Sequence, residues 1–304
     1  MSHITKPVPS KVPLVSIGMP VFNGERTVRH AIQALLAQTL DDFELIISDN
    51  CSTDGTAAIC LAFAEQDRRI RYVRQPENRG ADANFRFVFE QARGRYFMWA
   101  AADDLRSHDF LRTNAEFLSA HPDFVGSTSP VRFQGGEFDE LKMGDRSLNA
   151  PDSARRLVDF LAGRHANGRF YSLYRHEVVA SWAHLGDSRF LGADWTLVAH
   201  AARIGKLNRA ASGWVEFGRD GMSNTVDIFR RFREIPIDWL LPFRRLSKDM
   251  LSHVRAAPLS TRWLVFKRLA ALNGWAFLAQ FVVWYRRRPS AMARRAATSA
   301  ASEP

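Results

Sequence analysis

Residues 14–47 read LVSIGMPVFNGERTVRHAIQALLAQTLDDFELII and decide the fold. The first six residues are apolar or small and stop at Pro20, which indicates a short buried strand closed by the proline. A second apolar run follows at residues 43–47. Between the two runs the apolar residues recur at helical spacing, at Val28, Ile32, Leu35 and Leu36. This stretch therefore predicts a strand, an amphipathic helix and a second strand.

The same alternation continues along the chain. Further strands are predicted at residues 70–74, 95–100 and 124–131. The helix before the strand at 70–74 would bury one face, with Ala57, Leu61 and Ala64. The helix after that strand would bury Phe85, Val88, Phe89 and Ala92. Farther along, we expect a helix at 153–162, a strand at 169–174, a helix that begins after Asp194 and stops at Gly205, and a mostly helical region after residue 226. Strands that alternate with helices predict an α/β fold whose mostly parallel sheet is covered on both faces.

Polar side chains follow each of the first four predicted strands. They are Pro20 to Asn23, Asp49 and Asn50, Glu77 to Gly80, and Asp103 and Asp104. Ligands of such sheets bind beyond the carboxyl ends of the strands, so these residues are expected at one site. Asp41 and Asp42 lie at the opposite edge, which shows that solvated acids occur there too.

Asp103 and Asp104 come directly after the apolar run 96–102. Two carboxylates at the end of a buried strand suit a divalent cation that is shared with substrate phosphate. The alternative is an ordinary acidic start of a helix, since Asp is favoured there for capping and dipole reasons.

The composition is that of an ordinary globular protein, and only Cys51 and Cys60 are present. Two cysteines without zinc spacing predict reduced, structural thiols. The N-terminal residues show no apolar segment behind Lys6, so we expect no secretory signal and a cytoplasmic location.

The formal net charge of +10 is concentrated at the C-terminal end. Residues 226–304 contain 15 Lys and Arg against 5 Asp and Glu, while the first 225 residues contain 27 of each. Such asymmetry predicts a polyanionic partner. Long apolar stretches interrupt the basic residues, which favours an acidic membrane surface, at the inner face of the plasma membrane, and argues against nucleic acid.

Residues 269–285 carry no charge and reach only the short limit for crossing a bilayer. Asn273 and Gln280 would share one helix face and Phe277, Phe281 and Trp284 another, which fits a helix lying in the membrane interface. A hydrophobic helix packed on the rest of the protein is the alternative. The Ala-, Ser- and Arg-rich residues 289–304 predict a disordered tail.

Four segments carry a resemblance to a known family: 15–23, 47–56, 77–80 and 102–104. In order and spacing they resemble a family 2 glycosyltransferase with the GT-A fold, a Rossmann-like sheet with flanking helices. The match is close to about residue 133 and weaker through Gly192-Ala193-Asp194-Trp195. It implies a glycosyltransferase domain at 13–225, divided at 133/134 into nucleotide-sugar and acceptor halves, after a tail of residues 1–12 and before a basic amphipathic helical extension at 226–288.

The resemblance also implies roles for particular residues. Asp103 would bind a divalent cation, Mn²⁺ or Mg²⁺, and Asp194 would be the general base of an inverting transfer. Asp49 would contact the edge of the nucleotide base. The other residues expected to bind substrate are Pro20, Phe22, Asn23, Asn50, Asn78, Gly80, Asp104 and Arg219. The expected substrates are a nucleotide-diphosphate sugar, with UDP, dTDP or GDP, and a glycan or lipid-linked hydroxyl acceptor in polysaccharide or glycolipid synthesis.

Each of these residues also has a structural alternative. Asp49 could form an Asx turn, Asp194 could cap the following helix, and Arg219 could be an ordinary surface residue. Ala101 and Ala193 replace acids that the family usually carries, so a catalytically inactive, membrane-associated nucleotide-sugar-binding protein is a second hypothesis. A sugar-phosphate nucleotidyltransferase is a third, although residues 20–25 lack the Gly-rich basic loop expected of that class.

Overall fold

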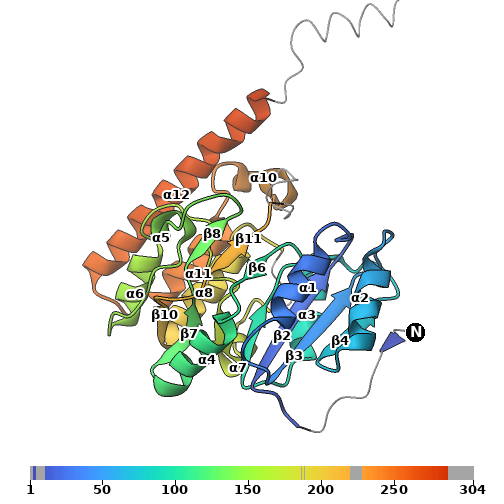
Figure 1. Cartoon of the computed structure of the whole chain (residues 1–304). Coiled ribbons are helices and arrows are strands. Elements are labelled where there is room, and N and C mark those ends of the chain that lie inside the picture. Colours follow the sequence, from blue (N-terminus) through green and yellow to red (C-terminus); the bar gives the residue numbers. More distant parts are fainter. Residues whose placement is uncertain (1–2, 5–10, 186, 188, 220–227, 287–304) are drawn as a thin grey trace, which may run out of the picture.

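The computed structural model describes residues 3–4, 11–185, 187, 189–219 and 228–286. The predicted disordered tail lies outside these residues. The N-terminal half contains β1 (His3–Ile4), β2 (Val15–Val21), α1 (Val28–Leu36), β3 (Phe43–Asp49), α2 (Thr56–Gln66), β4 (Ile70–Arg74), α3 (Gly80–Glu90), β5 (Tyr96–Trp99), β6 (Leu105–Arg106), α4 (Phe110–Ala120), β7 (Phe124–Thr128) and β8 (Val131–Phe133). The predicted strand–helix alternation is confirmed (Figure 1).

The second half contains α5 (Glu140–Met143), α6 (Ser153–Phe160), β9 (Leu173–Arg175), α7 (His176–Ala180), α8 (Ala193–Ile204), β10 (Lys206–Arg209), β11 (Val215–Phe217), α10 (Ile228–Arg231), the 3₁₀ helix η1 (Pro236–Trp239), α11 (Arg244–His253) and α12 (Leu259–Arg286). The strand predicted at 169–174 is wrong for its first four residues, because only Leu173–Arg175 pair in the sheet.

The main sheet has eight strands in the order β1-β4-β3-β2-β5-β9-β7-β10. The pairs β4-β3, β3-β2, β2-β5 and β7-β10 are parallel, while β1 and β9 run antiparallel to their neighbours. The mostly parallel α/β sheet that the sequence predicts is therefore confirmed. Its carboxyl edge collects the loops after β2, β3, β4 and β5.

Pro20 lies within β2, so the prediction that it closes the strand is wrong. The pairing of β2 with β5 ends at Gly18 and Trp99, and the Gly18 carbonyl accepts the last bond, from Ala100. Backbone groups two residues apart point to the same side of a strand. Pro20 therefore faces the side that β5 has already left, where its missing N–H breaks no ladder bond.

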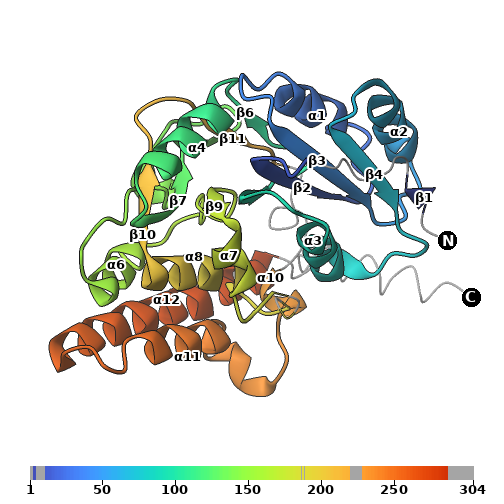
Figure 2. The same cartoon turned by 90° about the horizontal axis from the view of Figure 1, so that it is seen from below.

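Helices cover both faces of the main sheet (Figure 2). Ile17 and Met19 of β2 belong to a buried cluster with α1, α2 and α4, whereas Phe97 and Trp99 of β5 belong to a second cluster with α3, α6, α8, α11 and α12. In α2 the predicted apolar face is shifted. Leu61 is exposed, and Cys60, with a free thiol, is buried instead.

A second sheet of three strands, β6-β11-β8, lies beside the acidic loop that follows β5. Its register pairs Val215 with Arg106 and Glu216 with Leu105. This pairing brings the end of β11, with Gly218 and Arg219, next to Asp103 and Asp104.

The C-terminal helices pack on the rest of the protein. Leu246 of α11 and Val265 and Leu269 of α12 are buried in the same cluster as α6 and α8. Asn273 and Gln280 are buried too, so the face that they were expected to share packs against the protein, as in the alternative of a packed helix. Asn273 accepts from the Phe243 N–H at 2.9 Å, and Gln280 donates to the Trp239 carbonyl at 3.0 Å; both amides satisfy backbone groups of the preceding turns. No helix among the described residues is long and apolar enough to span a bilayer.

Candidate active site

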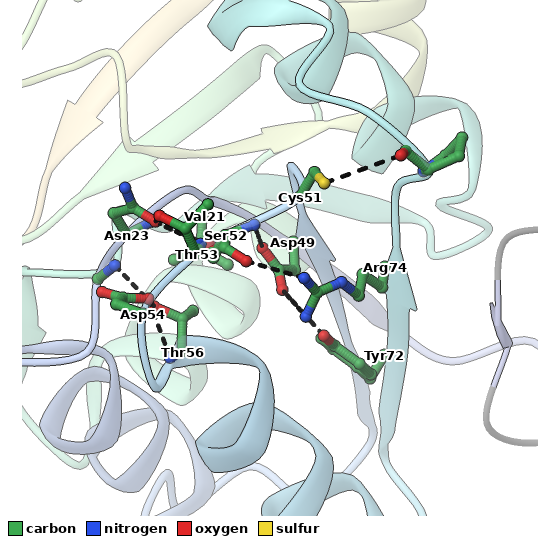
Figure 3. A network of polar contacts seen from close by, with 12 residues as sticks. Val21, Asn23, Asp49, Cys51, Ser52, Thr53, Asp54, Thr56, Tyr72 and Arg74 are labelled. Carbon is green, nitrogen blue, oxygen red and sulfur yellow. Dashed lines mark hydrogen bonds and ion pairs between the residues drawn. The ribbon is translucent and has the colours of Figure 1, made fainter.

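The loops after β2 and β3 are joined by hydrogen bonds (Figure 3). The Asn23 N–H donates to Ser52 Oγ at 2.9 Å, and Asn23 Oδ1 accepts from the Thr53 N–H at 2.9 Å. The Gly24 N–H donates to Thr56 Oγ1 at 2.8 Å. Asn23 has a φ of 51°, a conformation that Asn tolerates better than most residues. The two loops thus form one braced wall at the carboxyl edge of the sheet.

The candidate pocket residues Pro20 and Phe22 lie on this wall. Phe22 is 48% exposed and Pro20 is half-buried. Asp54 has a structural role just before α2, where it accepts from the Thr56 N–H at 3.0 Å, although the N-cap of this helix is Gly55.

Asp49 ends β3 and is completely buried. Its Oδ1 accepts from the Ser52 N–H at 2.8 Å, and its Oδ2 accepts from the Tyr72 hydroxyl at 3.0 Å. The Arg74 guanidinium lies 3.8 Å from the same oxygen (Figure 3). Asp49 therefore organises the 49–56 loop in this structure, and a direct contact with a nucleobase requires that loop to open.

Asn50 connects the same loop to the one after β4. Its Nδ2 donates to Asn78 Oδ1 at 2.9 Å and to the Gly80 carbonyl at 3.1 Å, and its Oδ1 accepts from the Arg79 N–H at 3.0 Å. Gly80 begins α3 with a φ of 84°, where glycine is favoured. The structure thus brings Asn50, Asn78 and Gly80 together as the sequence predicts.

Asp103 and Asp104 follow β5 on the same edge. A methyl group added at Gly24 would lie 3.6 Å from the Ala102 Cβ, so the acidic loop adjoins the loop after β2. Asp103 is half-buried and Asp104 is buried. The alternative of a helix start is wrong for this pair, because the next helix, α4, begins only at Phe110.

The two acids lie in different environments. Burial raises the pKa of the Asp104 carboxyl to about 7; nearby Arg106 opposes that rise, and the charge of Asp103 adds to it. Asp104 Oδ1 accepts from the Gly218 N–H at 3.2 Å, while Oδ2 is buried without a hydrogen-bond partner among the described residues. A buried carboxylate oxygen without a donor fits a cation ligand.

The end of β11 closes over this pair. A Cβ at Gly218 would lie 2.3 Å from Asp103 Oδ2, so only glycine fits there. The neighbouring Arg219 is exposed and donates through Nη2 to the Gln134 carbonyl at 3.0 Å. Arg219 therefore lies one residue from the acidic loop, near the position where a phosphate contact is expected.

Asp194 lies in the first turn of α8, after Gly192, which adopts a φ of 83° and occupies the N-cap position. Asp194 is therefore not the N-cap residue, and α8 begins one residue before it instead of after it. Backbone N–H groups of Asp194 and Trp195 still bond the carboxyl, so part of the structural role of an acid at a helix start remains. Asn167 donates from Nδ2 to Asp194 Oδ2 at 2.8 Å. Loss of water around the carboxyl raises the pKa of Asp194, and the Asn167 bond and the backbone bonds oppose that rise. A carboxylate of raised basicity suits proton abstraction.

Tyr171 links the two acidic positions electrostatically. Burial raises the pKa of its phenol, and the negative charges of Asp104 and Asp103 add to the rise. The charge of Asp194 acts in the same direction, so the phenol lies within electrostatic range of both positions. Its ring packs edge-on against Phe217 at 5.4 Å.

Sequence reasoning singled out neither Tyr171, Gly218 nor Asn167. Tyr171 falls within the strand predicted at 169–174, where it is one of several apolar residues and nothing in the pattern distinguishes it. Asn167 has a φ of 52° and precedes Gly168; the Asn-Gly dipeptide is a turn signal that could have identified it.

No group of three or more His, Cys, Asp or Glu side chains arranged to hold a metal occurs within the described ranges. A cation at Asp103 and Asp104 would thus need further oxygen ligands from a substrate or from water. That donor set fits Mg²⁺ or Mn²⁺, which commonly binds to one or two carboxylates and substrate phosphates.

Comparison with known proteins gives consistent matches. The model of glycosyl transferase family 2 matches residues 16–182. A putative teichuronic acid biosynthesis glycosyltransferase of Bacillus subtilis is 27% identical over 218 residues, which cover 66% of this chain and 86% of that protein. An uncharacterized glycosyltransferase of Haemophilus influenzae is 33% identical over 107 residues, or 35% of this chain and 43% of its own length.

Solved structures match the fold. The crystal structure of S. aureus TarS 1–349 in complex with UDP-GlcNAc superposes with a TM-score of 0.60 at 16% identity, covering 87% of this chain and 71% of that one. The mannosyltransferase PcManGT from Pyrobaculum calidifontis, in complex with GDP-Man and Mn²⁺, has a TM-score of 0.55 at 17% identity, covering 98% of this chain and 82% of that one.

Proposed function

Since this chain belongs to glycosyl transferase family 2, we propose that it moves one sugar from a nucleotide-diphosphate donor to a hydroxyl acceptor, with inversion at the transferred carbon. The observation that carries this proposal is a chain of contacts between two acidic positions. The Gly218 N–H donates to Asp104 Oδ1 at 3.2 Å, the neighbouring Phe217 packs on Tyr171 at 5.4 Å, and Asn167, four residues before Tyr171, donates to Asp194 Oδ2 at 2.8 Å. Two separate acidic positions suit an inverting transfer, in which one side assists the leaving diphosphate and the other accepts the proton of the attacking hydroxyl.

The donor would bind along the wall formed by the loops after β2, β3 and β4. Pro20, Phe22 and Asn23 would line the base and ribose, and Asp49 would contact the base edge once the 49–56 loop opens. Asn50, Asn78 and Gly80 would hold the third loop against the nucleotide. UDP and GDP are proposed because the TarS and PcManGT structures contain UDP-GlcNAc and GDP-Man, and dTDP is proposed from the family resemblance alone.

Asp103 would bind the divalent cation, and the buried Oδ2 of Asp104 suits the same ion. When bound, such an ion offsets the negative charge of the departing diphosphate. Arg219 would add a bidentate contact to phosphate. The Gly218 N–H holds the Asp104 carboxyl in place, so the end of β11 orients the acidic pair.

Asp194 would be the general base. Its raised pKa favours proton uptake, and Asn167 keeps the carboxylate oriented. The proton of the acceptor hydroxyl would move to a carboxylate oxygen of Asp194 as the hydroxyl oxygen attacks the sugar carbon. Ala193, which replaces the family's other acid, is buried, so the single carboxylate serves the role.

The acceptor is proposed to be a glycan or a lipid-linked glycan in polysaccharide or glycolipid synthesis. The Bacillus relative is named as a putative glycosyltransferase of teichuronic acid biosynthesis, and teichuronic acid is a polysaccharide. The proposed location is cytoplasmic, with contact to the inner face of the plasma membrane through the C-terminal helices.

Support for membrane contact comes from the outward face of α12. Its exposed apolar side chains include Trp263 (61% exposed) and Leu278 (64% exposed). Arg262 and Lys267 are exposed on the same helix, which contains no Asp or Glu. Aromatic and basic side chains together are typical of helices that lie on acidic lipid. In Figure 2, α11 and α12 lie on the far side of α8 from β2, β3 and β4.

Membrane contact can be tested by sedimentation with liposomes that contain anionic or only zwitterionic lipid. The double variant Trp263→Ser, Leu278→Ser should lose binding to anionic liposomes. Leu141→Ser removes an equally exposed leucine from α5 and should not. Unchanged sedimentation of the double variant rejects membrane contact, and concentration-dependent dimer formation that the same variant abolishes would assign the face to a second copy instead.

The transferase proposal is tested by incubating the protein with UDP-, GDP- and dTDP-sugars and Mn²⁺ and measuring release of the nucleoside diphosphate. We expect release from one donor class, strong loss in Asp103→Ala and in Asp194→Asn, and retained nucleotide binding in Asp194→Asn. Binding without turnover in the wild type would favour the inactive nucleotide-sugar-binding protein. Release of pyrophosphate from a nucleoside triphosphate and a sugar phosphate would identify a nucleotidyltransferase.

A further inference from the structure

The segment 165–168 encloses the carboxyl of Asp194. Asn167 is 2% exposed and donates from Nδ2 to Asp194 Oδ2 at 2.8 Å. Its Oδ1 is buried and has no partner among the described residues. An unsatisfied buried amide oxygen is costly, so a side chain selected only for packing would not be an asparagine. Among the residues that the structure describes, this side chain makes a single hydrogen bond, and its partner is Asp194.

The backbone of Asn167 is held in a left-handed conformation, with a φ of 52°. Its N–H donates to His165 Nδ1 at 3.1 Å, and its carbonyl accepts from the Phe170 N–H at 3.1 Å. The next residue, Gly168, donates to the Met143 carbonyl, which ties the segment to α5. The direction of the amide is therefore fixed from both sides.

His165 contributes through a single tautomer. Its Nε2 lies 2.9 Å from the Phe160 carbonyl and must donate there, which leaves Nδ1 free to accept from Asn167. Burial lowers the pKa of His165 to about 4; the Phe160 bond and the charge of Asp145 oppose the shift, and the charges of Arg146 and Arg169 favour it. The imidazole is thus neutral near pH 7.

The histidine ring also contacts the helix that carries the base. It stacks on Trp195, the residue after Asp194, with ring centroids 4.1 Å apart and planes 5° apart. On another side it lies against Gly144, where an added Cβ would come within 2.2 Å of Nδ1. His165, Asn167 and Trp195 thus surround Asp194 with groups that have little freedom to move.

We propose that Asn167 is a positioning residue for the general base: its amide orients the Asp194 carboxylate toward the acceptor, and neutral His165 fixes Asn167 in that direction. This proposal rests on the proposed role of Asp194. The amide donates to the charged form of the carboxylate, so it also limits how far the enclosed site can raise the proton affinity of the base. Proton abstraction requires a carboxylate that is held in one direction and is still ionised at the working pH.

The test is the pH profile of kcat/KM in the donor and acceptor assay with saturating metal. Glycine can adopt the same left-handed backbone, so Asn167→Gly removes only the amide. The pKa of Asp194 should then rise, and the acid limb of the profile should move up by about one pH unit. At a pH below the limb, kcat/KM would be about tenfold lower than in the wild type. Asn167→Asp keeps the shape but places two carboxylates in contact, so the limb should move farther in the same direction.

Asn208→Ala is the matched control. It removes a half-buried amide bond that goes to Ser127 Oγ at 3.0 Å and not to Asp194. We expect a lower melting temperature and an unchanged acid limb. If neither Asn167 variant moves the limb while Asp194→Asn is inactive, the positioning role is refuted and the base assignment stands. If Asp194→Asn transfers sugar at the wild-type rate, the base assignment itself fails.

Discussion

Gly218 donates its backbone N–H to Asp104 Oδ1 at 3.2 Å, although the two residues are 114 positions apart in the chain. The bond forms because β11 pairs with β6, which directly follows the acidic loop. A strand from the second half of the chain thereby helps to determine the geometry of the acidic pair that follows β5. This contact depends on Gly218, so a substitution of Gly218 tests whether the contact matters for the site.

Gly218→Ala should impair metal-dependent activity as well as stability. The new Cβ would clash with the carboxylate of Asp103 and with its backbone carbonyl oxygen, so the acidic loop itself must move. We expect donor turnover to fall by about tenfold or more, in line with the effect of small displacements of reacting groups. Activity assays across a Mn²⁺ titration would measure this effect.

Gly274→Ala is the control for that variant. Gly274 is exposed on α12, and nothing lies within 4 Å of an added Cβ. Alanine in a helix is about 1 kcal/mol more favourable than glycine, so the melting temperature should rise slightly and activity should stay the same. Equal turnover in Gly218→Ala and Gly274→Ala would contradict the role of β11.

Asp49→Asn and Tyr72→Phe should separate the structural and binding roles of Asp49. Tyr72→Phe removes one buried hydrogen bond to the carboxylate, at a cost of about 1–2 kcal/mol of stability, and leaves the charge in place. Asp49→Asn also changes the group that would contact the base. We expect both variants to melt earlier, but only Asp49→Asn to change the affinity ratio between UDP and GDP, measured by calorimetry. An unchanged ratio in Asp49→Asn excludes base reading by this residue.

Acid should destabilise the protein partly through His200. This buried side chain lies 3.0 Å from Ser181 Oγ; burial lowers its pKa to about 4, with the charges of Arg203 and His253 adding to the shift. The folded pKa is below that of the unfolded chain, so the stability from the neutral ring is complete above about pH 6.5 and is lost as the pH falls toward 4. At pH 5 the loss would be about 2 kcal/mol.

His200→Asn should therefore lose less stability than the wild type between pH 7 and pH 5, as measured by urea unfolding. His30→Asn, at an exposed position of α1, should follow the wild type. If His200→Asn and the wild type lose equal stability over this range, His200 is not a source of the acid sensitivity.

Phe243→Ala should show that the C-terminal helices support the catalytic half. An added Cβ at Gly192, the N-cap of α8, would lie 3.1 Å from the Phe243 ring, and Phe243 is buried. Loss of a buried phenylalanine costs about 3–5 kcal/mol. We expect a large drop in melting temperature together with a lower kcat, because α8 carries Asp194.

Phe281→Ala is its counterpart. Phe281 lies on the same C-terminal region but is 44% exposed, so its loss should change stability by much less. If both variants unfold at the same temperature, the packing of α11 against α8 contributes little.

The sequence predicted the sheet and the donor edge because hydrophobic periodicity and the strand-end rule are local properties. Asp49, Asn50, Asn78 and Gly80 were located at one edge in this way. The enclosure of Asp49 by Tyr72 could not be predicted, since it depends on the register of β3 against β4. Residues from distant parts of the chain meet only through such pairing.

The second half was predicted less well, for two physical reasons. Its strands are short, so β9 gave a weak signal, and Asn167 and Tyr171 lie in the irregular segment before it. In α12 the polar Asn273 and Gln280 face inward because they bind backbone groups, whereas periodicity predicted only that they share one helix face. A hydrophobic pattern cannot show that a polar side chain is buried because it makes hydrogen bonds to the backbone of a turn.

The central claim, a nucleotide-sugar site completed by a cation at Asp103, is tested most directly by calorimetric titration with UDP, GDP and dTDP, with and without Mn²⁺. We expect at least one nucleotide to bind with one site per chain and Mn²⁺ to strengthen the binding. Asp103→Ala should remove the strengthening while the protein stays folded. Absence of binding by all three nucleotides, with and without Mn²⁺, would contradict the central claim.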